Sequence, residues 1–314
     1  MSSRAEKKKN KKKKRKWLRV LLTILIILIA AVGAYSFSVY NSLTNAVDTM
    51  HSPLEREKSD KRTEEVSLKE AEPISVALLG VDQRENDKGR SDTIIILTVN
   101  PNTNSVKMLS IPRDTRVEIV GRGKSDKINH AYAFGGVEMS LNTIEEFLDI
   151  PIDYYVQINM EGFQDIVDAV GGVTVENDLD FTIDGRHYAK GTLNLNGDRA
   201  LYYARMRHED PRGDFGRQMR QRQVIQAVIN KGASLSSLTN YGDIFSALGN
   251  NVKTNLTFDE MVTIQSKYKG AINAIEQIEM NAQGAMINNV SYQIISDEEK
   301  QRVQNILKEN LEIK

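Results

Sequence analysis

The sequence contains no cysteine. Disulfide bonds and thiolate metal sites are therefore excluded, which suits an exported bacterial protein. Two nucleotide-binding patterns are also missing, because neither a Walker A motif nor a glycine-rich dinucleotide fingerprint occurs. The four histidines include no pair at zinc spacing, and no Ser-His-Asp or Cys-His arrangement stands out. The sequence thus gives no indication of a nucleotide cofactor, a zinc site or a nucleophilic triad.

Charged residues are missing from Val20 to Val47, whereas residues 1–19 contain eleven Lys or Arg and one Glu. The formal charge of zero therefore combines a tail of about +10 with a remainder of about −10. Residues 20–40 are 21 uncharged, mostly apolar residues, the length that a helix needs to cross a bilayer. We expect an uncleaved single-pass membrane anchor here, with a cytoplasmic basic tail and an extracellular remainder. A cleaved signal peptide is the alternative.

The chain after the anchor is expected to form a stalk and one domain. Residues 41–73 become rich in charge from Asp48 onward, contain few large apolar groups and end at a proline, which predicts a charged stalk. A single extracellular catalytic domain is expected over residues 74–314, with its main motifs in 74–232. The residues after 232 are expected to complete the fold and to wall a lipid groove.

Strand and helix patterns are mixed within this domain. Runs rich in Val, Ile and Tyr predict strands over residues 74–81, 93–100, 106–111, 154–159 and 173–176. Helices are predicted over residues 137–148, 161–170, 215–231, 258–269 and 297–311. We therefore predict an α/β fold: an α/β/α layered domain with a central mixed β-sheet, preceded by one transmembrane helix. The nearly continuous apolar run 93–99 predicts a central strand that is covered on both faces.

The first two predicted strands flank a loop that carries charge of both signs. If these strands pair antiparallel, Asp82 at the end of the first and Asp92 at the start of the second lie at the same sheet end. The third strand then runs back to that end and brings Arg113 and Arg116 of "PRDTR" beside them. Arg90, within the loop, belongs to the same group. One end of the sheet is therefore expected to collect two carboxylates and several guanidinium groups.

A second basic cluster lies in residues 202–223. In an extended segment, Arg205 and Arg207 would point the same way. Arg217 and Gln221 are i,i+4 neighbours on the following helix, and two valines continue their stripe toward the core. This stripe predicts that both side chains point inward near a helix N-terminus, where an anion is favoured. The other three arginines of the cluster are expected to pair with nearby acids such as Glu209, Asp210 and Asp214: Arg212, Arg220 and Arg222.

These groups together predict a site for a multiply charged phosphate. Guanidinium groups match phosphate oxygens with paired hydrogen bonds and stay charged at any relevant pH. Asp82 and Asp92 suit Mg²⁺, with Mn²⁺ as an alternative, because Mg²⁺ often takes one or two carboxylates plus phosphate oxygens. The spacing of the two aspartates alone is weak evidence, because acidic loops are common.

Several motifs, taken in order, resemble one known family. "LLGVD…GRSDTIIILTVNP", "MLSIPRDTRV", "KINHAYAFGG", "VDAVGGVTV", "LNGDRALYYARMRH" and "GRQMRQRQVIQA" resemble the LytR–CpsA–Psr family of Gram-positive bacteria, and within it the wall teichoic acid ligases. The resemblance covers roughly residues 74–232. It implies a phosphotransferase that moves a phosphoglycan from an undecaprenyl-pyrophosphate carrier onto a muramic acid hydroxyl of peptidoglycan. It also implies an α/β/α sheet domain with an apolar groove for the prenyl tail.

The resemblance also implies roles for individual residues. Asp82 and Asp92 match the positions that hold Mg²⁺ against the pyrophosphate. The matching pyrophosphate-binding positions are Arg90, Arg113, Arg205, Arg207, Arg217 and Gln221, with Arg116 as the second arginine near "PRD". The catalytic set is then Asp82, Arg90, Asp92, Arg113 and Arg217. The base that accepts the acceptor's proton is left open between Asp92 and Asp114.

Two other functions remain as alternatives. The chain could be a prenyl-pyrophosphate hydrolase that transfers to water, or a non-catalytic sensor or regulator of lipid pyrophosphate. A nucleic-acid partner is not expected, because nucleic-acid binding depends on neutralising phosphates and the part after the basic tail carries about −10. The expected partners are the carrier-linked glycopolymer, the peptidoglycan acceptor and membrane lipid.

Overall fold

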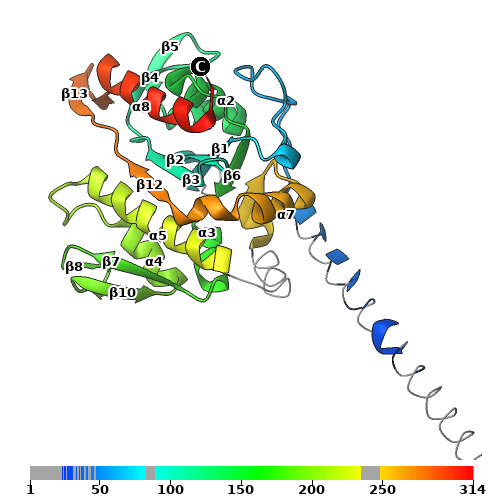
Figure 1. Ribbon diagram of the computed structural model, residues 1–314. Helices are drawn as coiled ribbons and strands as arrows, with labels where there is room; N and C mark the ends of the chain where they lie inside the picture. Colours follow the sequence, from blue (N-terminus) through cyan, green and yellow to red (C-terminus); the bar gives the residue numbers. More distant parts are fainter. Residues whose placement is uncertain are drawn as a thin grey trace, which may run out of the picture. The chain divides into compact units, whose positions relative to one another are not determined.

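The computed structural model describes residues 47–82, 89–234 and 248–313, together with scattered positions between 23 and 45. The chain divides into two compact units, residues 1–45 and 46–314. The larger unit is a mixed α/β domain built on a central mixed β-sheet, as the sequence predicts (Figure 1). The larger unit is not divided further.

The central sheet has six strands. Their spatial order is β11 (Val252–Thr254), β6 (Tyr154–Ile158), β1 (Ile74–Asp82), β2 (Arg90–Asn100), β3 (Ser105–Ser110) and β12 (Ile275–Ile278). The β1–β2, β2–β3 and β6–β11 pairs are antiparallel, whereas β1–β6 and β3–β12 are parallel. Both edge strands come from the part of the chain after residue 232, so the prediction that this part completes the fold is confirmed.

In the described part of the chain, six longer helices surround the sheet, and some of them pack directly on its two faces. They are α2 (His130–Leu148), α3 (Met160–Ala169), α4 (Gly197–Arg205), α5 (Asp214–Ser234), α7 (Phe258–Lys267) and α8 (Asp297–Leu311), with short 3₁₀ turns η1 (Leu68–Glu70), η2 (Gly249–Asn251) and η3 (Lys269–Asn273). Helices α2 and α8 contact β2 from one side, while α5 and η3 contact β3 from the other. The predicted helix 137–148 is the second part of α2, because Gly135 and Gly136 have non-helical backbone angles and divide that helix.

Four short strand pairs were not predicted. They are β4 (Arg116–Ile119) with β5 (Lys124–Lys127), β7 (Val173–Asn177) with β10 (Gly191–Leu195), β8 (Phe181–Ile183) with β9 (Arg186–Tyr188), and β13 (Gln283–Ile287) with β14 (Val290–Ile294). Only β7 among these eight strands was expected. The others have three to five residues, too few to show a clear alternation of apolar and polar side chains.

Strand β2 is buried on both faces, as its apolar run predicts. Ile94 and Ile96 belong to the core under α2 and α8, whereas Ile95 and Leu97 pack in the core that includes residues of α5. Successive side chains of a strand point to opposite faces, so an uninterrupted apolar run can fill two cores at once. This strand therefore fixes the position of the sheet between its two helical layers.

The segment expected to be a stalk packs on the domain. Arg62 Nη2 lies 2.7 Å from Asp153 Oδ2, and Arg56 Nη1 lies 2.5 Å from Glu145 Oε2, with both carboxylates nearly buried. Leu68 is 7 % exposed and belongs to a small core. The folded unit therefore begins before the expected boundary at residue 74, because these side chains have partners that lie far away in sequence.

The expected membrane anchor, residues 20–40, lies largely outside the described residues. Within the described part of the chain, no helix combines the length and the apolar character needed to cross a membrane. The anchor therefore stays a prediction.

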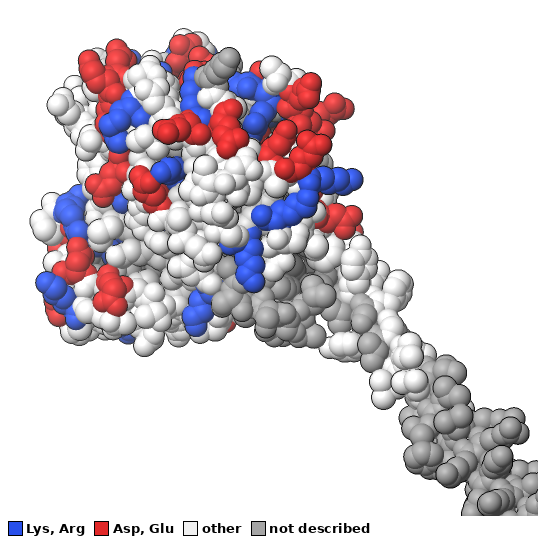
Figure 2. Space-filling model, in the orientation of Figure 1, with Lys and Arg blue, Asp and Glu red and all other residues white. Residues whose placement is uncertain are grey.

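Charged side chains of both signs are interspersed on the face of the folded unit in Figure 2. Acidic and basic residues alternate over short distances there, and white surface separates them. No single sign dominates this view.

Candidate active site

A β-bulge lies where β1 and β2 approach the charged loop. Gly80 is opposite Thr93 and Val81 is opposite Ser91, so Asp92 is an extra residue on β2. An extra residue changes the direction of the side chain at the bulge and exchanges the sheet faces to which the following side chains point. Bulges are over-represented next to active sites. Glycine is needed opposite, because a Cβ on Gly80 would lie 2.9 Å from Thr93 Cβ.

Beyond the bulge, Asp82 and Arg90 are direct partners across the two strands. Arg90 is exposed and Asp82 is half-buried. The antiparallel pairing that the sequence predicts is therefore confirmed, and it places Asp82, Arg90 and Asp92 at one end of the sheet. Residues 83–88 of the loop lie outside the described residues.

Arg113 reaches the same end of the sheet from β3. Its Nη1 lies 3.0 Å from Asp92 Oδ2, as predicted from the antiparallel β2–β3 pair. Burial alone would lower the pKa of Arg113, but the carboxylates of Asp92, Asp114 and Asp214 more than offset this and raise it. Arg113 Nε is buried and has no hydrogen-bond partner among the described residues. A fixed guanidinium with an unused N–H is suited to an incoming anion.

Arg217 points inward from the first turn of α5, as its stripe predicts. Its side chain is 12 % exposed and its Nη2 lies 2.5 Å from Asp214 Oδ1. Burial lowers the pKa of Arg217 from its ordinary value; Asp214 acts in the opposite direction, and the positive charges of Arg113 and Arg207 lower it further. Several cations are thus close enough to repel one another, an arrangement that an added anion would stabilise. Arg217 Nε also has no hydrogen-bond partner among the described residues.

The other predicted phosphate contacts differ in their exposure and in their position relative to Arg217. Helix α4 continues to Arg205, so the expected extended segment begins only after it. Arg205 is exposed and its Nη1 lies 3.5 Å from Met160 Sδ, whereas Arg207 is half-buried near Arg217. Gln221 lies one turn after Arg217 and is half-buried. Arg116 is exposed at the start of β4.

The two candidate bases are each held by cations. Asp92 accepts a 3.2 Å hydrogen bond from Asn129 Nδ2 in addition to its contact with Arg113. Asp114 Oδ1 lies 2.8 Å from Lys127 Nζ. Both carboxylates are partly exposed, at 34 % and 32 % of their side chains. The geometry therefore leaves the choice between Asp92 and Asp114 open.

The oxygen ligands at this end of the sheet fit a hard divalent cation that completes its shell with phosphate oxygens. Asp82 and Asp92 supply carboxylates, and Asn129 adds a buried Oδ1 that has no hydrogen-bond partner among the described residues. The described residues contain no group of three or more His, Cys, Asp or Glu that could hold a metal by itself. Mg²⁺ commonly uses one or two carboxylates together with substrate phosphate, so the residues fit a metal that binds with its substrate.

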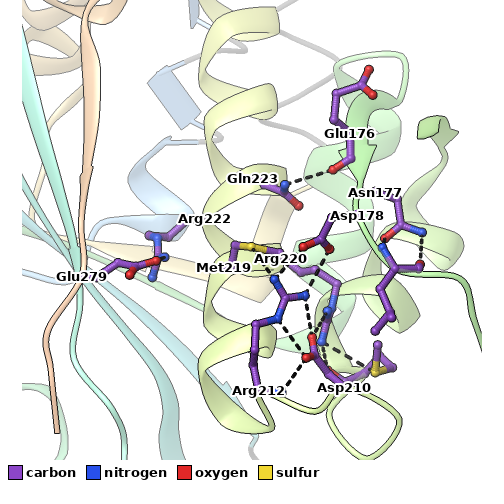
Figure 3. Close-up of polar contacts among 12 residues, drawn as sticks. Glu176, Asn177, Asp178, Asp210, Arg212, Met219, Arg220, Arg222, Gln223 and Glu279 are labelled. Atoms are coloured by element: carbon purple, nitrogen blue, oxygen red, sulfur yellow. Dashed lines mark hydrogen bonds and ion pairs between the residues drawn. The ribbon is translucent and has the colours of Figure 1, made fainter. Parts of the chain in front are cut away.

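A neighbouring network explains two of the remaining arginines. Figure 3 shows Arg212 and Arg220 converging on Asp210. Arg220 Nη1 lies 2.7 Å from Asp210 Oδ2 and both side chains are fully buried, while Arg212 also contacts Asp178 at 2.6 Å. A Cβ on Gly216 would lie 2.0 Å from Asp210 Oδ2, so only glycine allows this approach. The prediction that Arg212 and Arg220 pair with nearby acids is confirmed.

Two site residues differ from expectation. Asp214 was predicted only as a pairing acid for structural arginines, but it lies between Arg113 and Arg217 inside the cluster. The signal was its position three residues before Arg217 at a helix start. Arg222 does not use a nearby acid, because its buried guanidinium lies 3.4 Å from Glu279 of a distant segment.

Comparison with known proteins shows which family the chain resembles. The model of the LytR_cpsA_psr family matches residues 37–309. A protein of Bacillus cereus named polyisoprenyl-teichoic acid–peptidoglycan teichoic acid transferase TagU is 56 % identical over 282 residues, which cover 90 % of this chain and 93 % of that protein. The protein of the same name from Bacillus subtilis is 51 % identical over 280 residues, covering 89 % and 91 %.

Solved structures are similar as well. The crystal structure of Bacillus subtilis TagU has a TM-score of 0.63 at 51 % identity and covers 77 % of this chain and 98 % of its own. A structure described as TagT bound to LI-WTA has a TM-score of 0.72 at 33 % identity, covering 84 % and 100 %. An Enterococcus faecalis structure described as a transcriptional regulator has a TM-score of 0.74 at 42 % identity, covering 79 % and 91 %. The chain therefore belongs to the LytR_cpsA_psr family.

Proposed function

We propose that this chain transfers a phosphoglycan of the wall teichoic acid type from an undecaprenyl-pyrophosphate carrier to peptidoglycan at the outer face of the membrane. That it is an enzyme of the teichoic acid transferase type is confirmed by its relatives. The observation that carries the proposal is the convergence of Arg113, Arg217 and Asp92 at one sheet end, where two guanidinium Nε atoms have no hydrogen-bond partner among the described residues.

The proposed reaction breaks the phosphoanhydride bond of the donor pyrophosphate and forms a phosphodiester to the acceptor. The acceptor hydroxyl oxygen forms a bond to the phosphorus that carries the glycan, and the bond from that phosphorus to the prenyl-phosphate oxygen breaks. The hydroxyl proton passes to a carboxylate, Asp92 or Asp114, and prenyl phosphate leaves. Arg113 and Arg217 neutralise the pyrophosphate and the charge that develops on the leaving group, as phosphoryl transfer mainly requires positioning and electrostatic stabilisation.

Mg²⁺ or Mn²⁺, held by Asp82 and Asp92, would add charge neutralisation at the pyrophosphate. Arg90, Arg205, Arg207 and Gln221 are proposed as further pyrophosphate contacts, and Arg116 as a peripheral one. The donor already contains the high-energy pyrophosphate bond, so no nucleotide is required outside the cell.

The proposed topology is a single membrane pass with a cytoplasmic N-terminus and an extracellular domain. The basic tail before an uncharged run supports this orientation. Described apolar side chains within the run are exposed, among them Leu28 at 57 % and Phe37 at 72 %, which suits contact with lipid. Protease added to wall-stripped cells with intact membranes should cleave within residues 74–314. Protection until lysis would contradict the topology.

A nucleic-acid partner has little support here. On the face in Figure 2, basic and acidic side chains are interspersed and form no continuous basic stripe. The part of the chain after residue 19 carries about −10. Both features disfavour binding to phosphate backbones.

The test of the function is a reconstituted transfer assay. The full chain in lipid vesicles would receive a prenyl-pyrophosphoryl glycan donor, peptidoglycan oligomers and Mg²⁺, and products would be identified by mass spectrometry. The expected product is a glycan joined to peptidoglycan by a phosphodiester. Released phosphoglycan alone would indicate a hydrolase, and tight donor binding without any product would indicate a sensor.

A further inference from the structure

The outward face of α5 forms the floor of a groove that the proposed reaction does not use. The groove has a volume of about 450 Å³ and lies between β7 and β12. Side-chain amides dominate its polar lining, and a carboxylate and an ammonium group are also present. The lining residues that carry the argument are Glu176, Gln223, Gln226, Asn230, Lys231 and Gln277.

A buried arginine orients the amides at the floor. Arg222 is 4 % exposed, and its Nε donates a 3.0 Å hydrogen bond to Gln277 Oε1. Gln277 Nε2 in turn donates a 2.7 Å hydrogen bond to Gln226 Oε1. This chain fixes which end of each amide is the donor, so the Gln226 amide N–H groups are the atoms left to face a ligand. The buried guanidinium of Arg222 thus determines the orientation of the amide groups that line the groove.

On the β7 side of the groove, hydrogen bonds also fix the orientation of a side-chain amide, that of Gln223. Gln223 Nε2 donates to Glu176 O at 3.1 Å, while Gln223 Oε1 accepts from Tyr203 Oη at 2.9 Å. In Figure 3, Arg222 and Gln223 leave α5 on opposite sides, toward Glu279 and Glu176. The Glu176 carboxylate accepts from the Thr192 hydroxyl and keeps further acceptor capacity at the rim.

The lining selects a class of ligand by its chemistry. Amide donors at the floor match carbonyl oxygens, and the Glu176 carboxylate matches hydroxyl or amide N–H groups. Among the described residues, the lining includes only two apolar side chains, Val175 and Ala227, to contact a prenyl chain. A pyrophosphate would meet a single lining cation, Lys231, with two acids nearby. A second pocket of about 290 Å³ adjoins the groove, since Thr174 and Lys231 line both, and it adds Asn194 and Asn196. An extended neutral ligand with carbonyl, hydroxyl and N–H groups fits this surface best.

We propose that the groove binds an N-acetylated saccharide, and that this saccharide is part of the acceptor glycan strand. The assignment to the acceptor rests on the proposed transferase function. Gln223 lies six residues after Arg217 on α5, which at the rise of a helix is about 9 Å along the axis. Because Arg217 points inward and the groove lies on the outward face, a glycan strand that presents one sugar to the arginine cluster would pass around α5 to place its neighbouring sugars over the groove.

The direct test measures binding without turnover. The full chain in detergent would be titrated calorimetrically with a peptide-free N-acetylglucosamine–N-acetylmuramic acid tetrasaccharide, and with the same sugar after N-deacetylation. Gln226→Ala/Asn230→Ala should raise the Kd at least about tenfold, the loss expected for one or two hydrogen bonds. Gln301→Ala/Asn305→Ala is the matched control, because these residues form the same i,i+4 pair on α8. It should leave the Kd unchanged, and deacetylation should weaken binding to the wild type.

Equal affinity of the Gln226→Ala/Asn230→Ala variant and the wild type would overturn the proposal. The transfer assay with the same variant then shows whether the bound sugar belongs to the acceptor or to the donor. A rise in the KM for the acceptor at constant kcat supports the acceptor strand. A rise confined to the KM for the donor overturns that assignment. Failure of the proposed function itself has a different signature, because the wild type would then bind the tetrasaccharide but form no linked product.

Discussion

Arg113 Nη1 lies 3.0 Å from Asp92 Oδ2, although Asp92 belongs to β2 and Arg113 to the turn that follows β3. The contact joins a guanidinium that is expected to bind pyrophosphate to a carboxylate that is expected to bind metal. A cation and an anion held this close offset each other's charge and fix each other's orientation. The site is therefore organised by its own side chains before any substrate binds.

Arg217→Ala should lower the rate of transfer by about 10²–10³-fold, the loss typical of removing one preorganised electrostatic contact. The fold should persist, because the change removes a cation from a cluster of cations. Initial rates with donor and acceptor both saturating would measure the effect. Arg302→Ala is the control, since Arg302 also pairs with an acid three residues earlier at a helix start. Turnover within twofold of the wild type would contradict the role of Arg217.

Removal of divalent metal with a chelator should abolish transfer, and Mg²⁺ should restore it. Asp82→Ala should shift the restoring Mg²⁺ concentration upward, because one of the two expected carboxylate ligands is lost. Asp297→Ala changes an acid that lies outside the cluster, at the start of α8, and should leave the Mg²⁺ dependence unchanged. Full activity of the chelated wild type would exclude the proposed metal.

Gly80→Ala should reduce transfer without unfolding the domain. The new Cβ would lie 2.9 Å from Thr93 Cβ, which is too close, so the bulge that aims Asp92 must shift. Gly284→Ala provides the comparison, because this strand glycine has open space around its Cβ position. Circular dichroism would show that both variants keep their secondary structure. An unchanged rate for Gly80→Ala would mean that the bulge does not matter for the reaction.

Arg220→Ala should destabilise the domain by about 3 kcal/mol or more, because it leaves the buried carboxylate of Asp210 without a main partner. Arg212→Ala should cost less, since its side chain is 39 % exposed. Chemical denaturation of the folded unit gives both free energies of unfolding. A smaller loss for Arg220 than for Arg212 would contradict the structural role assigned to this network.

Acid should destabilise the wild type partly through Asp210. Burial alone would raise the pKa of Asp210, but hydrogen bonds from Arg212 and Arg220 more than offset this and hold it well below its ordinary value. A depressed pKa contributes stability above the unfolded-state value of about 3.9, and this stability is lost as the pH falls below it. Melting temperatures between pH 6 and pH 2.5 should therefore fall less steeply for Asp210→Asn. Asp180→Asn, with a 65 % exposed side chain, should retain the wild-type slope.

The central sheet and its charged end were predictable from local patterns. The apolar run 93–99 determined a strand buried on both faces, and two turns determined that Asp82, Asp92 and Arg113 meet at one end. The stripe from Arg217 to Val224 determined which face of α5 points inward. Such features follow from the spacing of apolar residues and from the turns that reverse the chain, and both can be read from the sequence alone.

Tertiary structure decided the features that depend on distant partners. The bulge at Asp92, the position of Asp214 between two arginines and the burial of Arg222 against Gln277 all require contacts that no local pattern reveals. The packing of residues 47–73 also depends on distant partners. Their charges predict a solvated stalk, but in the structure Arg56 pairs with Glu145 and Arg62 pairs with Asp153. A charged side chain is solvated or buried according to whether the fold supplies a partner, and only the packed chain determines that.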